Sequence, residues 1–550
     1  MPLRADRHHR HRDLEEPPGT FYADPSVHAL LEQPRATVHR EVPRARQVFV
    51  NRNLRMDKIE LVGFDMDYTL AMYSLRHLED LAFRMTLERL VANRGYPEAV
   101  AGLAYDPAFV IRGLVVDKLA GNIFKMDRHN HVGRCFHGRR ALPYDERKRL
   151  YRDEKIHLGM PRFAWIDTLF ALPEACLFAD IIEQLESRGI AVDYAKLYDD
   201  VRETIDEVHR DDSLKQIVKQ DLPRFIVRDK ELGPALHRLR SGGKRLFLLT
   251  NSLWDYTDCV MTYLLDGVLP EYPSWKNYFD VIVTGASKPG FFSERRPIVE
   301  LGPDGAPLGE AHSLERGRMY AGGSLAELER LVGIGGERVL YVGDHIYGDI
   351  LRSKKSSLWR TCMVVPEIEA EIAWLEQRHA EMEEMARLEE LRMRLDDELS
   401  ARKSALNALE RRLDRRDTPA DAREWIEAER REVKRELELL RRAHRDADFR
   451  LKQLQRAIEE GFNPYWGLMF KEGNENSRFG EQIEDYACLY TSRASNFLFY
   501  SPMQYFRSQR ASMPHERYSL RLAPYGDEHG APAAGDRPSK QTGKNGAPRP

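Results

Sequence analysis

The segment KIELVGFDMDYTL at 58–70 joins a short apolar run to two aspartates separated by one residue. The run at 58–64 has the length and composition of a buried β-strand. Three later apolar runs also end in polar residues: GKRLFLLTNS at 243–252, FDVIVTGASKPGFF at 279–292 and ERVLYVGDHIYGD at 337–349. LWDYTDCVMTYLL at 253–265 has helical spacing. Apolar strands separated by helices predict an α/β fold with a Rossmann-like parallel sheet and helices on its faces.

The polar ends of these runs should meet at one site, because ligands of open parallel sheets bind at the carboxyl ends of the strands. Asp65 and Asp67 follow the first run. An ionised aspartate can attack phosphorus, and a second one with a raised pKa can protonate the leaving oxygen. A DxD triplet alone is weak evidence, but its place after a buried strand favours a catalytic pair.

The other strand ends supply what phosphoryl transfer requires beyond a nucleophile. Thr250 can hydrogen-bond a phosphate oxygen, assisted by the backbone N–H groups of Asn251 and Ser252, and Lys288 supplies a cation. Each could instead be a helix cap or a surface residue. Their order at successive strand ends favours the functional interpretation.

The acidic residues predict a magnesium site. Asp65, a backbone carbonyl at Asp67, and Asp344 would suit Mg²⁺, which prefers a few oxygen ligands. Asp349 would support this site from behind the ligands.

The sequence divides into seven parts. We expect an N-terminal arm, a core in two pieces with a mainly helical cap inserted between them, a helical hairpin, a segment that packs on the core, and a disordered tail. The cap should also contain a β-hairpin at 122–138. The corresponding ranges are 1–45, 46–75, 76–225, 226–366, 367–460, 461–523 and 524–550.

The hairpin segment, residues 367–460, lacks glycine and is dense in Glu, Arg and Leu. Alternating four- and three-residue steps from Ile426 to Ile458 land mostly on apolar residues, which predicts an antiparallel coiled coil with about 45 residues in each arm. Thr418 is the expected N-cap of the second arm, with Pro419 at its first position.

Composition limits the range of partners. The chain has 550 residues, and 85 Lys and Arg balance 88 Asp and Glu, so we expect no nucleic-acid partner. The five cysteines are scattered, and no apolar stretch approaches the ~18 residues that span a bilayer. We therefore expect a soluble, cytoplasmic protein without a membrane partner.

Several motifs carry a family resemblance. DMDYT, LLTNS, SKPGFF and YVGDHIYGD resemble the four motifs of the haloacid dehalogenase superfamily of phosphatases. More narrowly, GFDMDYTLAMY, LFALPE, LTNSLWDYTDCVMTYL, GDHIYGDILRSKK and SMPHE resemble the cytosolic purine 5′-nucleotidase family. This similarity covers about residues 45–370 and 462–516.

The resemblance implies a Mg²⁺-dependent hydrolase of purine nucleoside 5′-monophosphates that prefers IMP and GMP. The reaction would pass through an aspartyl phosphate on Asp65, with Asp67 as acid and then base. Thr250 and Lys288 fall on phosphate-stabilising positions and Asp344 on a metal ligand. Some members pass the phosphate to another nucleoside. We also expect a homo-oligomer, either a dimer or a tetramer.

Substrate selection is expected in the cap. Arg202, Asp206 and His209 share one helix face, where the first two could equally form an exposed ion pair. The resemblance makes this a base-binding helix, in which Asp206 would accept from N1–H of a 6-oxopurine. It also implies that Phe170 stacks on the base and that Lys215 lies near the phosphate.

Other positions depart from the family pattern. Ala171 and Arg210 replace residues that would border the base. Tyr347 and Lys355 fall near positions of the family's regulatory site for adenine nucleotides, but Asp167 replaces an Asn there, so this site is only partly kept. A nucleotide effector is therefore a possible partner.

Two alternatives stay open from the sequence. The same core could act on another phosphomonoester, such as a sugar phosphate. Alternatively, the coiled-coil hairpin could be the functional part of an interaction protein, with the phosphatase core as its support. The intact Asp65, Asp67, Lys288 and Asp344 count against this last reading.

Overall fold

A computed structural model describes residues 42–509, except 155, 158, 352–356 and 416–418. The described residues up to Arg507 belong to one compact unit, whose fold is given below. Most of the expected arm and the whole expected tail lie outside the described residues.

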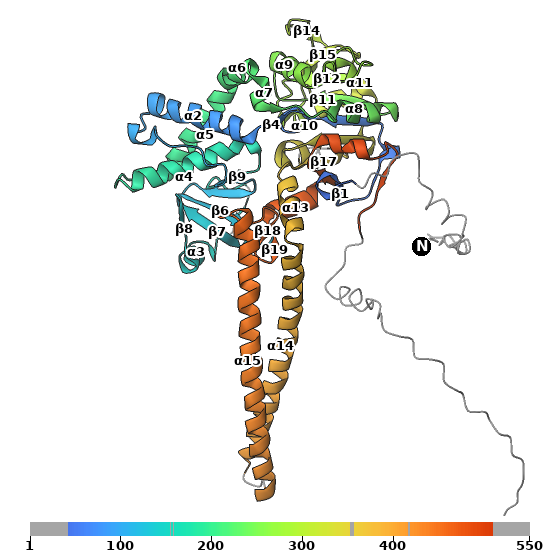
Figure 1. The fold of residues 1–550 in the computed structure, drawn as a ribbon. Helices are drawn as coiled ribbons and strands as arrows, with labels where there is room; N and C mark the ends of the chain where they lie inside the picture. The colour runs from blue at the N-terminus through green and yellow to red at the C-terminus, as the bar shows by residue number, and fades with distance from the viewer. Residues whose placement is uncertain (1–41, 155, 158, 352–356, 416–418, 510–550) are drawn as a thin grey trace, which may run out of the picture. The chain divides into compact units, whose positions relative to one another are not determined.

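A mixed ten-stranded sheet forms the centre of the described part of this unit (Figure 1). Its four predicted strands lie side by side and parallel, in the order β16-β3-β11-β12. The α/β fold with a parallel sheet is thereby confirmed. In spatial order, the strands are β1 (Val48–Val50), β20 (Leu489–Thr491), β17 (Arg360–Val364), β16 (Val339–Gly343), β3 (Leu61–Phe64), β11 (Arg245–Leu249), β12 (Val281–Thr284), β15 (Met319–Gly322), β13 (Ile298–Leu301) and β14 (Pro307–Glu310).

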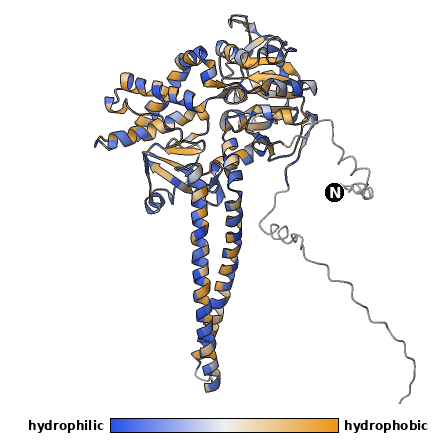
Figure 2. Ribbon diagram, viewed as in Figure 1, coloured by the Kyte–Doolittle hydropathy of each residue, from blue (hydrophilic) through white to orange (hydrophobic). Residues whose placement is uncertain are grey.

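The central strands are apolar along their whole length because both faces of the sheet are covered. In β3, Val62 and Phe64 belong to one hydrophobic cluster and Leu61 belongs to another. Successive side chains point to opposite faces, so two clusters imply two covered faces. Figure 2 shows the strands of this sheet in the hydrophobic colour. Gly63 permits close packing, because a Cβ there would lie 2.0 Å from the Phe247 ring.

The cap is mainly helical, as predicted, but it contains more strands than the sequence indicated. Helices α2 (Leu75–Arg94), α4 (Leu172–Glu186), α5 (Tyr194–Arg210) and α6 (Ser213–Gln220) form as expected. The β-hairpin predicted at 122–138 is part of a five-stranded antiparallel sheet, which the sequence did not indicate. Its strands are β8 (Arg140–Ala141), β7 (Val132–His137), β6 (Asn122–Met126), β5 (Leu114–Asp117) and β9 (Phe163–Ile166). The outer strands have only two to four residues, too few for a recognisable alternation.

Two long helices form the hairpin that follows the short helix α13 (Ile368–Gln377): α14 (His379–Leu413) and α15 (Ala420–Phe462). Ion pairs between Arg450 and Glu384 and between Lys434 and Glu410 show that the two helices run antiparallel. Although both helices are long, no described helix has an apolar stretch sufficient to cross a membrane.

The hairpin helices pack through the expected apolar positions. Buried residues include Leu399 and Leu409 on α14 and Val433 and Leu437 on α15. The arms have 35 and 43 residues, shorter than predicted. Pro419 precedes the first helical residue rather than occupying it, and Thr418 lies outside the described residues. Supercoiling of the pair stays a prediction.

The chain returns to the core after the hairpin. Strand β20 pairs in parallel with β17 and antiparallel with β1. Helix α16 (Arg478–Tyr486) contributes Phe479 and Ile483 to a cluster with Ile346 and Ile350, which lie just beyond β16. Residues from both ends of the described chain therefore complete the sheet beside the predicted site.

Candidate active site

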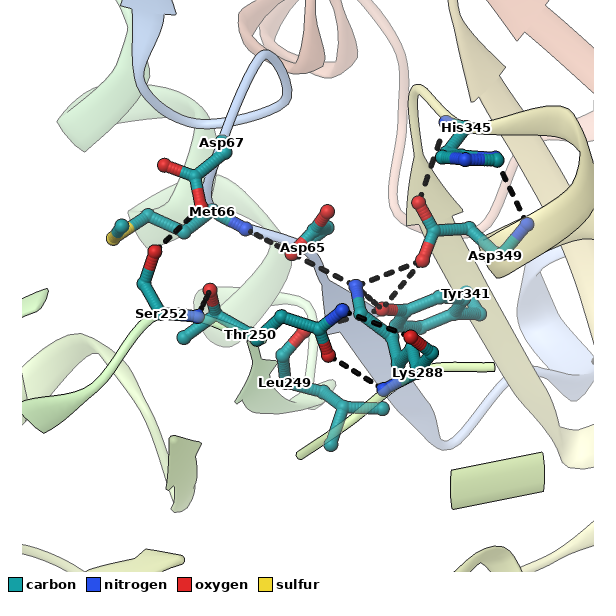
Figure 3. Close-up of polar contacts among 12 residues, drawn as sticks. Asp65, Met66, Asp67, Leu249, Thr250, Ser252, Lys288, Tyr341, His345 and Asp349 are labelled. Atoms are coloured by element: carbon teal, nitrogen blue, oxygen red, sulfur yellow. Dashed lines mark hydrogen bonds and ion pairs between the residues drawn. The ribbon is translucent and has the colours of Figure 1, made fainter. Parts of the chain in front are cut away.

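Four neighbouring strand ends bring the predicted catalytic residues together (Figure 3). Asp65 and Asp67 follow β3, Thr250 follows β11, and Asp344 follows β16. Lys288 lies in the loop after β12. Because these strands are parallel and adjacent, their carboxyl ends share one edge of the sheet.

Three buried carboxylates form the centre of the site. One oxygen each from Asp65, Asp344 and Asp349 lies within 4.8 Å of the others. Burial raises the pKa of Asp344 well above its ordinary value, and the nearby carboxylates of Asp349 and Asp65 raise it further. Asp344 Oδ2 is buried without a hydrogen-bond partner among the described residues. A charge cluster of this kind is costly unless a cation neutralises it.

Asp349 reaches the cluster from a π-helix at Ile346–Leu351. The backbone N–H of His345 donates to Asp349 Oδ2 at 3.3 Å. Gly343 leaves room for this carboxylate, because a Cβ there would lie 2.6 Å from Asp349 Oδ2. Asp349 therefore stands among the gathered carboxylates rather than behind them, where we predicted it.

Lys288 supplies a cation that contacts two carboxylates of this cluster directly. Its Nζ lies 2.8 Å from Asp65 Oδ1 and 2.8 Å from Asp349 Oδ1. Nζ also donates to the Tyr341 hydroxyl at 3.0 Å. Burial alone would lower the pKa of Lys288, but Asp349 and Asp65 outweigh it and raise that pKa well above its ordinary value. The lysine therefore stays charged.

These residues fit a divalent cation with a preference for oxygen ligands. Three carboxylates face one lysine, and one buried carboxylate oxygen has no partner among the described residues. Mg²⁺ accepts such a ligand set. We predicted a metal contact from the Asp67 backbone carbonyl, and that contact stays a prediction.

The Asp67 carboxylate is held by two hydroxyls. Tyr73 Oη donates to Oδ1 at 2.6 Å, and Ser252 Oγ donates to Oδ2 at 2.8 Å. The hydroxyl of Tyr256 lies 2.9 Å from that of Tyr73. The roles of these two tyrosines were not predicted from the sequence, because no local spacing links them to Asp67. Tyr73 lies on β4 (Met72–Tyr73), which pairs with β10 (Ile226–Val227). This position brings the Tyr73 hydroxyl back to Asp67.

The environment of Asp65 differs from that of Asp67. Burial raises the pKa of Asp65 to about 7, although the charge of Lys288 opposes this shift. Lys288 Nζ and the backbone N–H of Met66 both contact Oδ1. Among the described residues, Oδ2 is therefore the oxygen of Asp65 that is not engaged by these donors.

Thr250, Asn251 and Ser252 form a short linked turn. Thr250 Oγ1 is buried and accepts from the Ser252 backbone N–H at 3.0 Å. Asn251 Oδ1 accepts from the Lys288 backbone N–H at 2.6 Å, and its Nδ2 donates to the Lys288 carbonyl at 3.0 Å. The Asn251 side chain thus holds the backbone that carries Lys288, and the predicted contact of the Asn251 backbone N–H with phosphate stays a prediction.

Helix α5 presents the predicted base-binding residues. Arg202 Nη1 donates to Glu174 Oε2 at 2.7 Å, and its Nε lies 3.5 Å from Asp206 Oδ2. Glu174 is fully buried and also accepts from the Tyr198 hydroxyl. The ion pair between Arg202 and Asp206 that spacing allowed is therefore part of a larger network with Glu174, a residue that no local spacing indicated.

Aromatic contacts link the cap to the loop after β3, which carries Asp65 and Asp67. The Phe170 ring lies 4.8 Å from that of Tyr68, the residue after Asp67, and 5.5 Å from that of His209. Lys215 Nζ lies 5.0 Å from the Tyr256 ring. Phe170 therefore contacts the residue next to Asp67 directly, and His209 is linked to that residue through Phe170. Lys215 is linked to Asp67 through Tyr256 and Tyr73.

His209 has an unusual environment. Burial, assisted by the charge of Lys215, lowers its pKa to about 4. Its Nε2 is buried without a hydrogen-bond partner among the described residues. The ring is therefore neutral at pH 7 and can exchange one hydrogen bond with a ligand.

The structure describes only some of the residues that depart from the family pattern or belong to the expected effector site. Ala171 is buried and Arg210 is exposed at the end of α5. Burial lowers the pKa of Arg112, but the charges of Glu367, Asp344 and Asp167 raise it, so Asp167 lies near Arg112. Lys355 and the side chain of Tyr347 lie outside the described residues. Effector binding at these positions stays a prediction.

Known proteins resemble this chain over most of its length. A 5′-nucleotidase domain-containing protein of Dictyostelium discoideum is 30% identical over 86% of this chain and 75% of its own length. The 5′-nucleotidase domain-containing protein 2 of Rattus norvegicus is 32% identical over 64% of this chain and 66% of its own. The human protein of the same name is 32% identical over 59% and 64%, so the match spans slightly less than two thirds of these two relatives. A model of the 5′ nucleotidase family matches residues 48–518. The chain therefore belongs to the 5′ nucleotidase family of hydrolases.

Proposed function

We propose that this protein is a Mg²⁺-dependent 5′-nucleotidase that hydrolyses purine nucleoside 5′-monophosphates of the IMP and GMP type. The observation that carries the proposal is the cluster of Asp65, Asp344 and Asp349 carboxylates beside Lys288, with the Asp67 carboxylate held separately. This arrangement combines oxygen ligands, a nucleophile, an acid and a fixed cation. The family assignment supports a nucleotide as the substrate.

In the proposed reaction, Asp65 Oδ2 attacks the phosphorus and the bond between phosphorus and the nucleoside O5′ breaks. Asp67 gives its proton to O5′, and the nucleoside leaves. Asp67 then takes a proton from water, whose oxygen attacks the phosphorus and releases phosphate and Asp65. When bound, Mg²⁺ would be held by Asp65, Asp344 and Asp349 and would neutralise negative charge on the phosphoryl group.

Lys288 and the turn after β11 complete the proposed phosphate site. The Lys288 charge offsets the charge of the transferring group, and Asn251 keeps the lysine loop in place. Thr250 and the N–H groups near Ser252 would bind phosphate oxygens. Lys215 would contact the substrate phosphate from the cap, because its charge lies beside Tyr256, which contacts Tyr73.

Base selection would occur on α5. The carboxylate of Asp206 can accept from N1–H of a 6-oxopurine, and adenine offers no such donor. Buried Glu174 orients Arg202 toward the same helix face. Phe170 would stack on the base, and neutral His209 would exchange a hydrogen bond through Nε2. We include transfer of the phosphate to a second nucleoside as part of this proposal.

The proposal also includes the cellular location, the oligomeric state and an effector of this protein. A cytoplasmic location is supported by the five cysteines, all of which are free thiols. A homo-oligomer and a nucleotide effector are proposed from the family resemblance alone.

Phosphate release from IMP, GMP, AMP, UMP and sugar phosphates, with and without Mg²⁺, tests the proposal. We expect turnover that requires Mg²⁺ and favours IMP and GMP, and inosine as acceptor would reveal transfer. Equal turnover of sugar phosphates and nucleotides would instead support the broader phosphomonoesterase. Asp65→Asn should abolish turnover, because an amide is not a nucleophile for phosphorus. Hydrolysis by the pure variant would contradict the assigned nucleophile.

A further inference from the structure

Arg112 is a buried arginine that the proposed mechanism does not use. It lies in the loop before β5, at the edge of the cap sheet, and only 1% of its surface is exposed. Its Nη1 donates to the backbone carbonyl of Asp344 at 2.8 Å. Its Nε and Nη2 donate to the two carboxylate oxygens of Glu367 at 2.7 and 2.6 Å. One guanidinium therefore joins the cap, the loop after β16 and the residue before α13.

The contact with Asp344 involves the backbone of a residue whose side chain stands in the carboxylate cluster. Asp344 Oδ2 has no hydrogen-bond partner among the described residues. The backbone of the loop is therefore an important determinant of where this carboxylate points. A bond to the Asp344 carbonyl fixes the peptide plane next to its Cα and thereby restricts the direction of its side chain.

Only an arginine can make this set of contacts. Its planar fork binds Glu367 with two donors and still has Nη1 for the carbonyl, whereas a lysine has a single nitrogen. The ring of Phe479 on α16 packs on the guanidinium, with 5.2 Å between the ring centre and Cζ. Glu367 is the N-cap residue of α13, the helix that leads into the hairpin. Glu367 and Phe479 thus hold the arginine, and the arginine holds the loop that carries Asp344.

We propose that Arg112 is a positioning residue for the metal site, which fixes the Asp344 loop for cation binding and is itself oriented by Glu367. This inference rests on the proposed Mg²⁺-dependent function. It goes further because it makes the affinity for the cation depend on a contact between the cap and the base of the hairpin. Arg112 does not touch substrate, so its effect should appear in the Mg²⁺ dependence rather than in base selection.

The test measures Mg²⁺ binding to the full-length protein by calorimetry, separately from turnover. Arg112→Lys should raise the dissociation constant for Mg²⁺ by about 10- to 100-fold, as is usual when a group that orients a metal ligand is lost. Saturating Mg²⁺ should restore most of kcat, and the KM for IMP should change by less than about threefold. Glu367→Gln keeps the acceptor but loses the charge, so it should weaken Mg²⁺ binding by a smaller factor.

The control is a matched pair on the same helix. Arg493 binds Glu369 on α13 with two donors at 2.6 and 2.7 Å, two residues beyond Glu367, and does not bond the Asp344 carbonyl. Arg493→Lys should therefore leave Mg²⁺ affinity unchanged.

Three results would overturn the inference: Arg112→Lys that folds and binds Mg²⁺ like the wild type, equal weakening by Arg493→Lys, or a wild type that binds no Mg²⁺. If Arg112→Lys does not fold, unchanged Mg²⁺ affinity in Glu367→Gln would overturn it. A wild type that binds Mg²⁺ but hydrolyses no nucleotide would refute the proposed function alone, because calorimetry still tests Arg112.

Discussion

The hydroxyl of Ser252 donates a hydrogen bond to Asp67 Oδ2 at 2.8 Å, although the two residues are 185 positions apart in the sequence. They follow the adjacent parallel strands β3 and β11, and the bond joins the two strand ends. With Tyr73 on the other oxygen, the Asp67 carboxylate has one fixed orientation. An acid that must protonate a leaving oxygen depends on such a fixed position.

We therefore expect Ser252→Ala to lower kcat about tenfold, equivalent to ~1.4 kcal/mol of transition-state stabilisation. Tyr73→Phe should have a similar effect, because each change removes one of the two donors to Asp67. Steady-state kinetics with IMP at saturating Mg²⁺ would measure this. Ser187→Ala is the control, since Ser187 is exposed at the end of α4. Wild-type kcat in both site variants would show that the two hydroxyls do not position Asp67.

Gly343→Ala should damage the carboxylate cluster without adding or removing charge. The new Cβ would lie 2.6 Å from Oδ2 and 2.7 Å from Cβ of Asp349, so Asp349 must move, and this disturbs its ion pair with Lys288. We expect a loss of about 1–3 kcal/mol in the free energy of unfolding, together with weaker Mg²⁺ binding. Chemical denaturation and calorimetry would measure these two effects. Gly102→Ala, where a Cβ meets nothing within 4 Å, should change neither. Unaltered Mg²⁺ binding in Gly343→Ala would contradict the tight packing at Asp349.

Glu79 on α2 predicts a pH dependence of stability. The residue is buried, Tyr105 donates to its Oε2, and its Oε1 has no partner among the described residues. Burial raises the pKa of Glu79 to about 8, which is above the value of about 4.5 in an unfolded chain. The folded state therefore holds a proton that the unfolded state releases between these two pH values.

The stability contributed by protonated Glu79 is complete below about pH 4.5 and is lost as the pH rises to about 8. Glu79→Gln removes this loss, so the variant should gain stability relative to the wild type between pH 5 and 8. Urea unfolding at several pH values would measure the difference. Glu88→Gln, an exposed position on the same helix, serves as the control. A difference between Glu79→Gln and wild type that stays constant with pH would show that Glu79 titrates normally.

The outer part of the hairpin should be dispensable for hydrolysis. Replacing residues 393–447 by a short glycine-rich turn between Arg392 and Asp448, which form an ion pair at 3.5 Å, keeps the base of both helices. We expect phosphate release from IMP within about threefold of the wild type. A much larger loss would show that the distal hairpin takes part in catalysis, and a lost partner contact with normal turnover would support an interaction role.

A deeper deletion of 372–458 should behave differently. It removes Trp374, whose indole N–H donates to the Ile458 carbonyl at 2.9 Å, and shifts Glu459, which pairs with Arg134 of the cap sheet. We expect this variant to melt at a lower temperature than the shorter deletion, because it breaks contacts at the hairpin base. Equal melting temperatures would show that these contacts contribute little.

The sequence identified the four central strands because each is an apolar run that ends in polar residues. Local pattern was sufficient there, since both faces of the strands are buried. It failed in the cap sheet, where strands such as Arg140–Ala141 are too short to show a period. The length of a strand, rather than its place in the chain, therefore decided whether the sequence predicted it.

The strand-end residues that we predict to be catalytic were recognisable in the sequence, but the residues that contact them were not. Tyr73, Glu174 and Arg112 act through contacts between separate elements, for which no spacing rule exists. Asp349 illustrates a second limit. It follows Asp344 by five residues, and the π-helix that brings its carboxylate to the cluster is a rare local geometry that residue preferences do not indicate.

The place of β20 in the sheet has a consequence for how the protein is made. This strand lies between β1 and β17, yet it is synthesised after the whole hairpin. A nascent chain that already carries every aspartate of the cluster still lacks the strand to which β1 pairs. The ribosome must therefore release residues beyond 491 before the two ends of the domain can join, and a messenger truncated within the hairpin should yield an inactive product.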